Sequence, residues 1–286
     1  MQIGINGAKL IDVNQRLPAG DYVLGTDDDE LKRLGIQHLV WRPRVMDAWR
    51  RAGFSAGQHV LDVGCGPGYA TLDLASIAGQ GGRVTAIDRS PRFLDHAAVA
   101  AKAAGLDNVD FVERDLDASE LPLVNADGAW CRWVFAFLSK PRELLRSLRA
   151  SMKPGGKLVV YEYFDYATWK LVPRSPAFET FVEAVMKSWR HTGGEPDIAI
   201  DLLSWLPEEG FEIVELRPFV DVVSPVDSIW QWPSSFVEVG LSRLVELGHL
   251  DNEQANATRA AFADAEGNPD SRLITPAVLE IIARRV

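Results

Sequence analysis

Cysteine is scarce in this sequence: only Cys65 and Cys131 occur among 286 residues. Two cysteines in apolar surroundings supply neither a disulfide framework nor a metal cluster, so we expect a reducing compartment, no metal site and two small buried hydrophobic side chains. Long apolar runs are also missing, since no stretch reaches the ~20 residues of a membrane span. The first residues show no charged leader followed by an apolar core. We therefore expect a cytoplasmic protein that does not bind membranes.

Positive charge is also in deficit, with 30 Lys and Arg residues against 40 Asp and Glu residues and a net charge of −10. Contacts with phosphate backbones require clustered Lys and Arg, so this balance argues against a nucleic-acid partner. The remaining composition, 47% apolar and 24% charged, is ordinary for a globular chain that buries a large core. A small molecule is the expected partner.

The middle of the chain alternates between strand-like and helix-like patterns. Strands are expected at 59–63, 83–87, 109–113, 127–134 and 157–163, with helices at 69–78, 91–104 and 141–151. This alternation is typical of a parallel sheet with helices on both faces. The sequence "KPGG" at 153–156 predicts a turn between the last helix and the last strand.

The flanking segments are mostly helical in pattern. An acidic run opens a predicted helix at 27–51, where negative charge favours a helix start. Further helices are expected at 176–192, 197–208 and 226–264, and a strand at 211–223. The apolar stretch at 278–285 fits a helix or a strand by pattern alone.

One segment carries the strongest functional signal, "HVLDVGCGPGYATLDLAS" at 59–76. A buried strand, the closely spaced Gly64, Gly66 and Gly68, and a helix N-terminus form a site for a nucleotide-like ligand. Tyr69 occupies the position of the third glycine in a dinucleotide motif, so NAD and other nucleotide cofactors both remain open. Asp88 ends the next strand at about the ~20-residue offset of a ribose-binding carboxylate.

Four segments in order resemble the successive motifs of the class I S-adenosylmethionine-dependent methyltransferases: "VLDVGCGPGYAT", Asp88 after "VTAI", "VERDLD" and "SMKPGGKLVVYE". The resemblance covers about residues 55–165. It implies an α/β, Rossmann-like, doubly wound seven-stranded sheet of order 3-2-1-4-5-7-6 with the last strand antiparallel. Residues 211–223 and 278–285 would then be the sixth and seventh strands. The implied division is a helical cap at 1–54, a core at 55–223 and 276–286, and a helical insertion at 224–275 beside the acceptor site.

The resemblance also implies a site for S-adenosylmethionine, which leaves as S-adenosylhomocysteine. The backbone at Gly64, Cys65 and Gly66 would pass close to the methionine part of this cofactor. Asp62 would reach its ammonium group through water, and Arg132 would line the same end.

The adenosine part of the cofactor would meet the ends of the next two strands. Asp88 would bind the ribose hydroxyls and Arg89 would stack beside the adenine. Asp115 would accept a hydrogen bond from the adenine amino group, and Leu116 would donate its backbone N–H to the ring.

A further segment, "YVLGTDDDELKRLGIQ", resembles the N-terminal cap of many methyltransferases that act on small molecules. Tyr22 and Gln37 would there contact the amino-acid end of the cofactor, and Arg33 is a candidate partner for its carboxylate. An exposed charged helix face explains the same residues equally well.

The expected acceptor is a small hydrophobic or aromatic metabolite, as in secondary metabolism. The loop "WCRWVFAFLSKP" lacks the N/D-P-P-Y/F element typical of enzymes that methylate nucleobases or glutamine amides. Aromatic side chains that could face a planar acceptor are Trp133, Phe135, Tyr163, Phe164, Tyr166, Trp169, Trp189, Trp230 and Trp232.

Methyl transfer needs mainly in-line alignment of the acceptor, with oxygen favoured as the accepting atom and nitrogen or carbon as alternatives. A hydroxyl acceptor would benefit from a general base, for which His38 and His191 are the candidates, followed by His249. Two other functions remain open, a non-catalytic S-adenosylmethionine-binding regulatory protein and an NAD-dependent oxidoreductase. The oligomeric state is also open, with a homodimer as one option.

Overall fold

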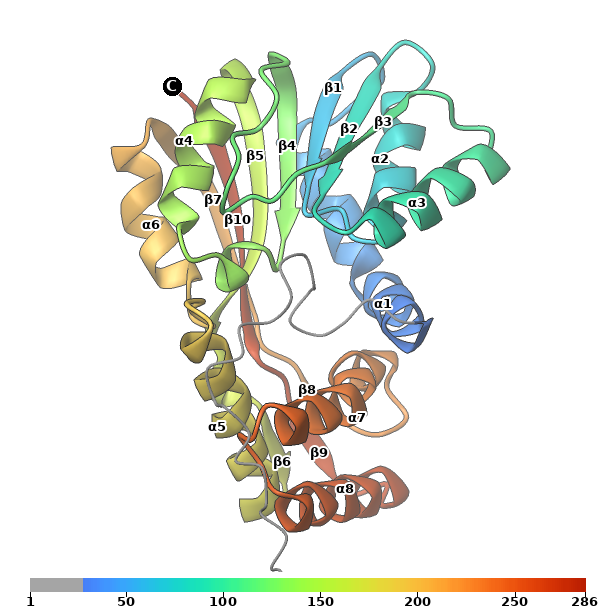
Figure 1. Cartoon of the computed structure of the whole chain (residues 1–286), viewed down its shortest axis with the longest axis vertical. Helices are drawn as coiled ribbons and strands as arrows, with labels where there is room; N and C mark the ends of the chain where they lie inside the picture. Colours follow the sequence, from blue (N-terminus) through green and yellow to red (C-terminus); the bar gives the residue numbers. More distant parts are fainter. Residues whose placement is uncertain (1–27) are drawn as a thin grey trace, which may run out of the picture.

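The computed structural model describes residues 28–286, which contain a seven-stranded sheet of order β3-β2-β1-β4-β5-β10-β7 (Figure 1). Its strands are β1 (His59–Val63), β2 (Arg83–Asp88), β3 (Val109–Glu113), β4 (Ala126–Arg132), β5 (Met152–Asp165), β7 (Phe211–Phe219) and β10 (Ala277–Arg285). The pairs among the first five strands are parallel, whereas β10 runs antiparallel to both β5 and β7. The predicted fold class and strand order are confirmed, and residues 278–285 form a strand.

Helices cover both faces of this sheet, as expected for strands that are buried on both sides. One apolar cluster joins α1 (Asp28–Ala52) and α2 (Tyr69–Ala78) to the sheet, and another joins α4 (Pro141–Ser151) and α6 (Ala199–Glu208) to its opposite face. Helix α3 (Pro91–Ala103) packs beside α2 along β2 and β3. No helix within residues 28–286 is both long and apolar enough to cross a membrane.

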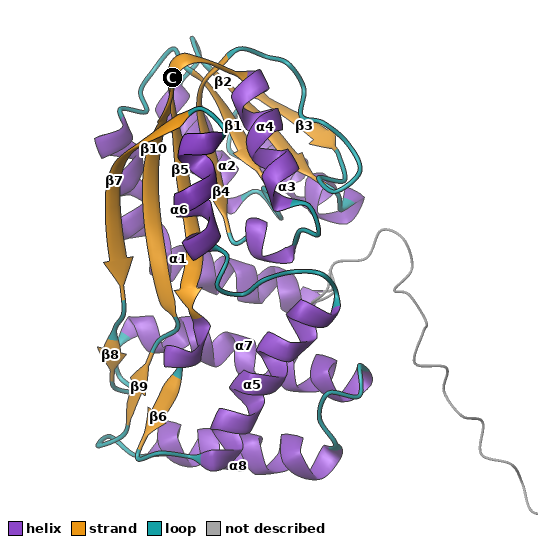
Figure 2. Cartoon of the chain, turned by 90° about the vertical axis from the view of Figure 1, so that its left-hand side faces the viewer, coloured by secondary structure: helices purple, strands orange, loops and turns teal. Residues whose placement is uncertain are grey.

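The helices α5 (Pro176–His191), α7 (Gln231–Glu246) and α8 (Asn252–Gly267) lie together beyond one end of the sheet (Figure 2). The helical pattern predicted at 226–264 is divided between more than one helix. The chain makes a short turn of 3₁₀ helix, η3 (Ser228–Trp230), and then two helices. Gly248 at φ 71° follows α7, and Asp251 begins α8 with a capping box. These local signals end one helix and start another.

A second, three-stranded sheet of order β6-β9-β8 was not predicted. It pairs β6 (Lys170–Val172), β9 (Arg272–Ile274) and β8 (Val222–Val223), all antiparallel. The strand predicted at 211–223 is therefore interrupted after Phe219, and its last two residues form β8 in the second sheet. Asp221 leaves the main sheet because its backbone exchanges hydrogen bonds with Thr275 and its carboxylate accepts two from Arg44, at 2.8 and 2.7 Å.

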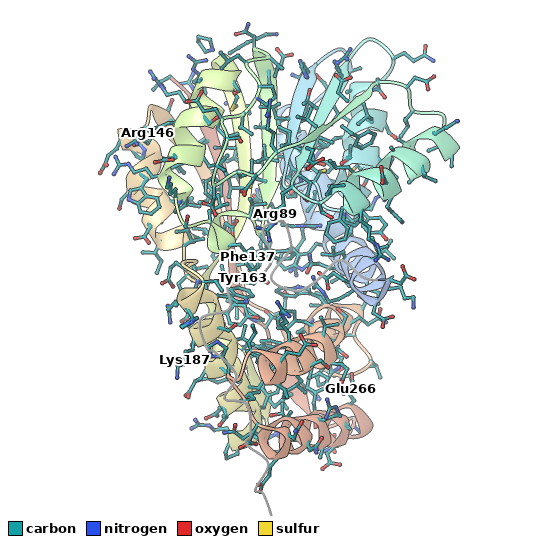
Figure 3. All side chains as sticks on the ribbon, in the orientation of Figure 1. Arg89, Phe137, Arg146, Tyr163, Lys187 and Glu266 are labelled. Carbon is teal, nitrogen blue, oxygen red and sulfur yellow. The ribbon has the colours of Figure 1, made fainter. Side chains whose placement is uncertain are left out.

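The predicted turn at 153–156 lies inside a strand. Strand β5 begins at Met152, directly after α4, and its pairing with β4 shifts register between Ala126 and Gly128. Gly155 has φ 82° there, so the segment is an irregular strand start. At the other end of β5, Phe137 and Tyr163 lie where the sheet meets the outer helices (Figure 3).

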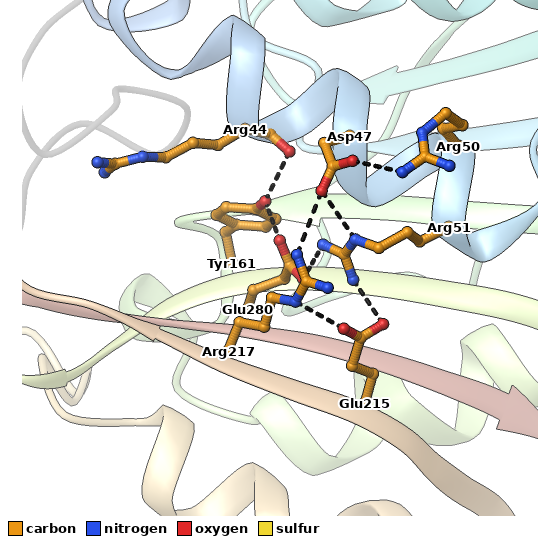
Figure 4. Close-up of polar contacts among 8 residues, drawn as sticks. All are labelled: Arg44, Asp47, Arg50, Arg51, Tyr161, Glu215, Arg217 and Glu280. Carbon is orange, nitrogen blue, oxygen red and sulfur yellow. Dashed lines mark hydrogen bonds and ion pairs between the residues drawn. The ribbon is translucent and has the colours of Figure 1, made fainter.

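A buried ion-pair network holds α1 against the sheet (Figure 4). Glu280 in β10 is 1% exposed and accepts hydrogen bonds from Arg51 and from the Tyr161 hydroxyl. Arg51 also donates to Glu215 in β7 at 2.6 Å and to Asp47 at 2.9 Å. One arginine of α1 is thereby bound to the edge strand β7 and to its neighbour β10.

Candidate cofactor and acceptor site

The glycine turn between β1 and α2 is tied to the end of β2. The N–H groups of Gly64 and Cys65 donate to the Ile87 carbonyl oxygen at 2.8 and 2.9 Å. All three glycines of the turn have positive φ. A Cβ on Gly68 would lie 2.5 Å from the Cβ of Ala97 in α3, so this glycine allows close helix packing. The turn thus positions its backbone at the carboxyl ends of β1 and β2, where open parallel sheets bind ligands.

Substitution of Gly64 by alanine should lower the free energy of unfolding by about 2–5 kcal/mol. The new Cβ would lie 2.2 Å from Val134 Cγ2, which adds an overpacking cost to the cost of a non-glycine residue at φ 68°. Gly53 is a matched control, because it has φ 86° but no atom within 4 Å of an added Cβ. Gly53→Ala should cost only about 1–2 kcal/mol. Urea denaturation measures both, and equal costs would contradict the close contact at Val134.

A cavity of about 160 Å³ opens at this edge of the sheet. Ten of the twelve residues predicted to bind the cofactor line it: Gln37, Asp62, Gly64, Cys65, Gly66, Asp88, Arg89, Asp115, Leu116 and Arg132. Leu34, Tyr69 and Phe93 also line it, and sequence reasoning missed them. Their apolar or aromatic side chains follow the ordinary core pattern of α1, α2 and α3, so nothing in the sequence marked them as cavity residues.

Asp88 is fixed by two backbone donors at the centre of this cavity. Its Oδ2 accepts from the Gly66 N–H at 2.8 Å and its Oδ1 from the Ser90 N–H at 2.9 Å. Burial raises the pKa of Asp88, and the two backbone donors oppose that rise. Each carboxylate oxygen keeps a second lone pair for a ligand hydroxyl. Asp115, in contrast, is exposed and accepts from the Asp117 N–H at 3.0 Å, as in an ordinary Asx turn.

The cavity lining also holds two groups of opposite charge, Asp62 and Arg132. Asp62 is 1% exposed and accepts from the Thr71 hydroxyl at 2.6 Å, and burial raises its pKa to about 7. Burial lowers the pKa of Arg132 to about 10, and its Nη1 has no hydrogen-bond partner among the described residues. A buried, unpaired charged donor is costly. A ligand with an anionic group beside Arg132 and a cationic group beside Asp62 would give each buried side chain an oppositely charged partner.

A second, aromatic cavity of about 30 Å³ adjoins the first. It is lined by Arg33, Gln37, Trp133, Phe137, Tyr163, Tyr166, Trp169, Trp189, Trp232, Pro233, Phe236 and Pro276. Six of the nine predicted aromatic residues are in this lining, whereas Phe135, Phe164 and Trp230 are not. Phe137 lies in the 3₁₀ turn η1 (Phe135–Phe137) and was missed. The sequence pattern does not distinguish it from the buried residues beside it.

Trp133 belongs to the wall between the two cavities, together with Gln37 and Phe137. Its ring stacks on Trp232 and on Tyr163, with centroids 5.5 Å apart in each pair. Its backbone has φ 52°, a conformation that bulky residues rarely adopt. Such strain persists where the surroundings enforce it and is concentrated at functional sites.

The segment before and within α1 supplied three predicted cofactor contacts: Tyr22, Arg33 and Gln37. Tyr22 lies outside the described residues. Arg33 lines the second cavity, not the first, and donates at 2.6 Å to each carboxylate oxygen of Glu30. Its Nη1 also donates to Gln37 Oε1 at 3.0 Å. Gln37 therefore has its amide oxygen held by Arg33 and presents its N–H donors elsewhere.

Neither proposed base lines a cavity. His38 is buried with its Nε2 3.1 Å from Asp73 Oδ2, so it joins α1 to α2. His191 is exposed, and its ring centroid lies 5.7 Å from that of His249. The described cavity linings thus do not include the ring of His38 or of His191, and a catalytic base at either residue stays a prediction that this geometry does not favour.

Glu162 accepts hydrogen bonds from the backbone of the turn that follows β4. It is fully buried, and its Oε1 accepts from the N–H groups of Val134 and Phe135 at 2.7 and 2.8 Å. Its Oε2 has no partner among the described residues. Burial raises the pKa of Glu162 to about 8 despite these backbone donors.

We expect Glu162→Gln to remove a pH dependence of stability. A carboxyl group whose pKa is raised on folding stabilises the fold fully below its unfolded pKa of 4.5 and loses this contribution as the pH rises through 8. Between pH 5 and 8 the variant should therefore gain stability over the wild type by up to about 1.4 kcal/mol per pH unit. Urea denaturation at several pH values measures this, and a constant difference would mean that Glu162 is ionised throughout.

The comparisons with known proteins agree with this geometry. Residues 60–156 match the family model described as "Methyltransferase domain". Ubiquinone biosynthesis O-methyltransferase of Schizosaccharomyces pombe is 33% identical over 133 residues, 44% of this chain and 46% of that protein. Demethylmenaquinone methyltransferase of Lactococcus lactis is 30% identical over 154 residues, 52% and 57% of the two chains. The chain thus spans about half the length of the curated relatives it matches.

Solved structures share the fold at low sequence identity. The [4+2]-cyclase SpnF has a TM-score of 0.53 at 24% identity over 85% of this chain and 80% of its own. A putative methyltransferase from Bacillus halodurans has 0.57 at 19%, over 84% and 97%. An S-adenosylmethionine-dependent methyltransferase from Thiobacillus denitrificans, solved with S-adenosylhomocysteine, has 0.50 at 20%, over 85% and 90%.

The strand order and the glycine turn define a Rossmann-like fold. Residues 60–156 match a methyltransferase domain, and solved S-adenosylmethionine-dependent methyltransferases share the fold of the chain. The predicted family and cofactor are confirmed, and the NAD-dependent alternative is set aside. The roles of the individual site residues stay predictions.

Proposed function

We propose that this protein transfers a methyl group from S-adenosylmethionine to a small, planar, hydrophobic metabolite, with oxygen as the favoured accepting atom. One observation carries this proposal: the cavity at the glycine turn and the aromatic cavity share a wall made of Gln37, Trp133 and Phe137. A ligand in the first cavity and one against the second would meet at that wall. The relatives named for ubiquinone and menaquinone biosynthesis support an acceptor of this kind.

The residues present fit the proposed cofactor. Asp88 would bind the ribose hydroxyls through its free lone pairs, with Arg89, Asp115 and Leu116 along the adenine. Arg132 would pair with the cofactor carboxylate, which satisfies a buried donor that has no other partner in the described part of the chain. Asp62 would interact with the ammonium group, and the positive charge would favour its ionised form.

Catalysis would rest on positioning and on exclusion of water. The cofactor supplies an activated methyl group, so the chain has to hold an acceptor oxygen about 3–3.5 Å away and in line. Among the described residues that line the two cavities there is no histidine or lysine. The acceptor should therefore ionise readily, as an acidic phenol or enol does, and lose its proton to water before attack.

The broader predictions are retained with this function. The acceptor is a free small molecule, nucleic acid is not a substrate, and the protein acts in the cytoplasm. We also propose the division into a helical cap at 1–54, a core, and an insertion at 224–275. The same fold serves a [4+2]-cyclase, so a cofactor-binding protein without methyl transfer is the second candidate.

Calorimetry with S-adenosylmethionine, S-adenosylhomocysteine and NAD, followed by an assay with methyl-labelled cofactor and a panel of phenols, tests the proposal. We expect binding of both adenosyl ligands, none of NAD, and label in at least one phenol. Binding without turnover on the whole panel would favour the non-catalytic candidate. Transfer to RNA or protein would refute a small-molecule acceptor.

A further inference from the structure

The lining of the second cavity contains two indole N–H donors without a partner among the described residues, beside the hydroxyls of Tyr163 and Tyr166, which can donate or accept. No carboxylate is among its described lining residues, and the amide oxygen of Gln37 is taken by Arg33. Two lining residues, Trp133 and Trp169, have buried indole N–H groups without a partner in the described structure. Trp169 is 1% exposed and is enclosed by aromatic rings, including Phe178 at 5.1 Å between centroids.

Unpaired buried N–H groups are costly, and native proteins usually satisfy them. A ligand atom that accepts hydrogen bonds would recover this cost, whereas an apolar or donating group would not. The lining therefore discriminates by chemistry as well as by shape. A carbonyl or ionised oxygen can accept from these N–H groups, whereas an alkyl or ammonium group cannot.

The volume of the second cavity limits how much of a ligand enters. About 30 Å³ has room for a small group and not for an aromatic ring. A planar ring would instead lie against the shared wall at Trp133, with one oxygen in the second cavity. Its reacting hydroxyl, on the far side of the ring, would then face the first cavity.

We infer that the acceptor is a phenol or enol conjugated with a carbonyl group, and that Trp133 and Trp169 recognise the carbonyl oxygen. This inference rests on the proposed function and specifies its substrate class. Conjugation with a carbonyl makes a phenol more acidic, and hydrogen bonds to that carbonyl stabilise the resulting anion further. The site would thereby favour the ionised nucleophile without a histidine or lysine among the described lining residues.

Two probes that differ only in the carbonyl test this inference. Calorimetry in the presence of S-adenosylhomocysteine compares 4-hydroxyacetophenone with 4-ethylphenol, in which a methylene replaces the carbonyl. The wild-type protein should bind the ketone about tenfold more tightly, the size of one hydrogen bond. Trp169→Phe, which keeps an aromatic ring and removes the N–H, should reduce this preference to less than about threefold.

Trp49→Phe is the matched control, because Trp49 also has a buried, unpaired indole N–H but lines neither cavity. It should retain the tenfold preference. Trp133→Phe provides a second test should Trp169→Phe fail to fold. Equal binding of the two probes by the wild type, binding of neither, or a preference that survives in the cavity variants would overturn the inference.

The experiment separates this inference from the proposed function. Probe binding requires no turnover, so a carbonyl preference without methyl transfer would support the cavity assignment and refute the enzyme activity. Conversely, methyl transfer to phenols with no carbonyl preference would leave the proposed function intact and refute the assignment of the second cavity.

Discussion

Glu280→Ala should lower the free energy of unfolding by about 3–5 kcal/mol, because it leaves Arg51 without its most deeply buried partner. Glu280 is 1% exposed in a central strand and also accepts from the Tyr161 hydroxyl, so the substitution removes two hydrogen bonds at once. Urea denaturation followed by circular dichroism measures the change. Should the alanine variant fail to fold, Glu280→Gln, which keeps an acceptor oxygen but no charge, should show a smaller loss.

Glu212→Ala is the matched control for this prediction. Glu212 lies in β7 and pairs across the strands with Arg284 of β10, but both side chains are about half exposed. An exposed pair contributes little, so the control should cost less than about 1 kcal/mol. If Glu280→Ala costs no more than Glu212→Ala, the network in Figure 4 does not hold α1 on the sheet.

Asp88→Ala should weaken the binding of S-adenosylhomocysteine by about 1–3 kcal/mol, roughly fivefold to 150-fold. The substitution removes charge-assisted hydrogen bonds to the ligand hydroxyls. It also removes the acceptor of the Gly66 N–H, which fixes the glycine turn. Calorimetry at constant salt measures the affinity, and thermal unfolding shows whether the fold is intact.

Asp110→Ala controls for the loss of a carboxylate near the same strands. Asp110 lies in β3, pairs with the exposed Arg83, and does not line the cavity. Its substitution should leave the affinity unchanged. An unchanged affinity in Asp88→Ala would mean that other residues hold the ribose.

The central fold was predictable because its signals are local and ordered along the chain. Buried strands followed by helices predict a parallel sheet, and the glycine turn marks where a ligand meets it. The carboxyl ends of the parallel strands meet at one edge, where most of the ten predicted residues that line the first cavity lie. Their individual roles, and the place of Gln37 on α1, came from the family resemblance. The apolar run at 278–285 fits either a helix or a strand by pattern alone. Only the family resemblance predicted that it forms a strand.

The features that were missed depend on contacts between distant segments. Strands β6, β8 and β9 have only two or three residues each, and their pairings join Lys170 to Ile274 and Val222 to Ile274, which are far apart in the sequence. The histidines could not be placed from sequence either. His38 is on the same face of α1 as residues that line the site, but its ring is turned toward Asp73. The unpaired indoles of Trp133 and Trp169 are properties of packing, which composition does not record.

The three-stranded sheet has a consequence for how acceptor preference can change. Its central strand β9 follows α8, while β6 and β8 come from segments before α5 and before α7. The aromatic cavity draws residues from both of these segments, including Trp169 and Trp232. The segment that contains β6 and the segment that contains β8 and β9 therefore form one structural module, although they are separate in the sequence. Exchange of residues 224–275 alone between homologues would replace β9 but keep the original β6 and β8, with which β9 has to pair. A new acceptor specificity is thus expected to arise by paired substitutions across the module, and not by transfer of a single loop.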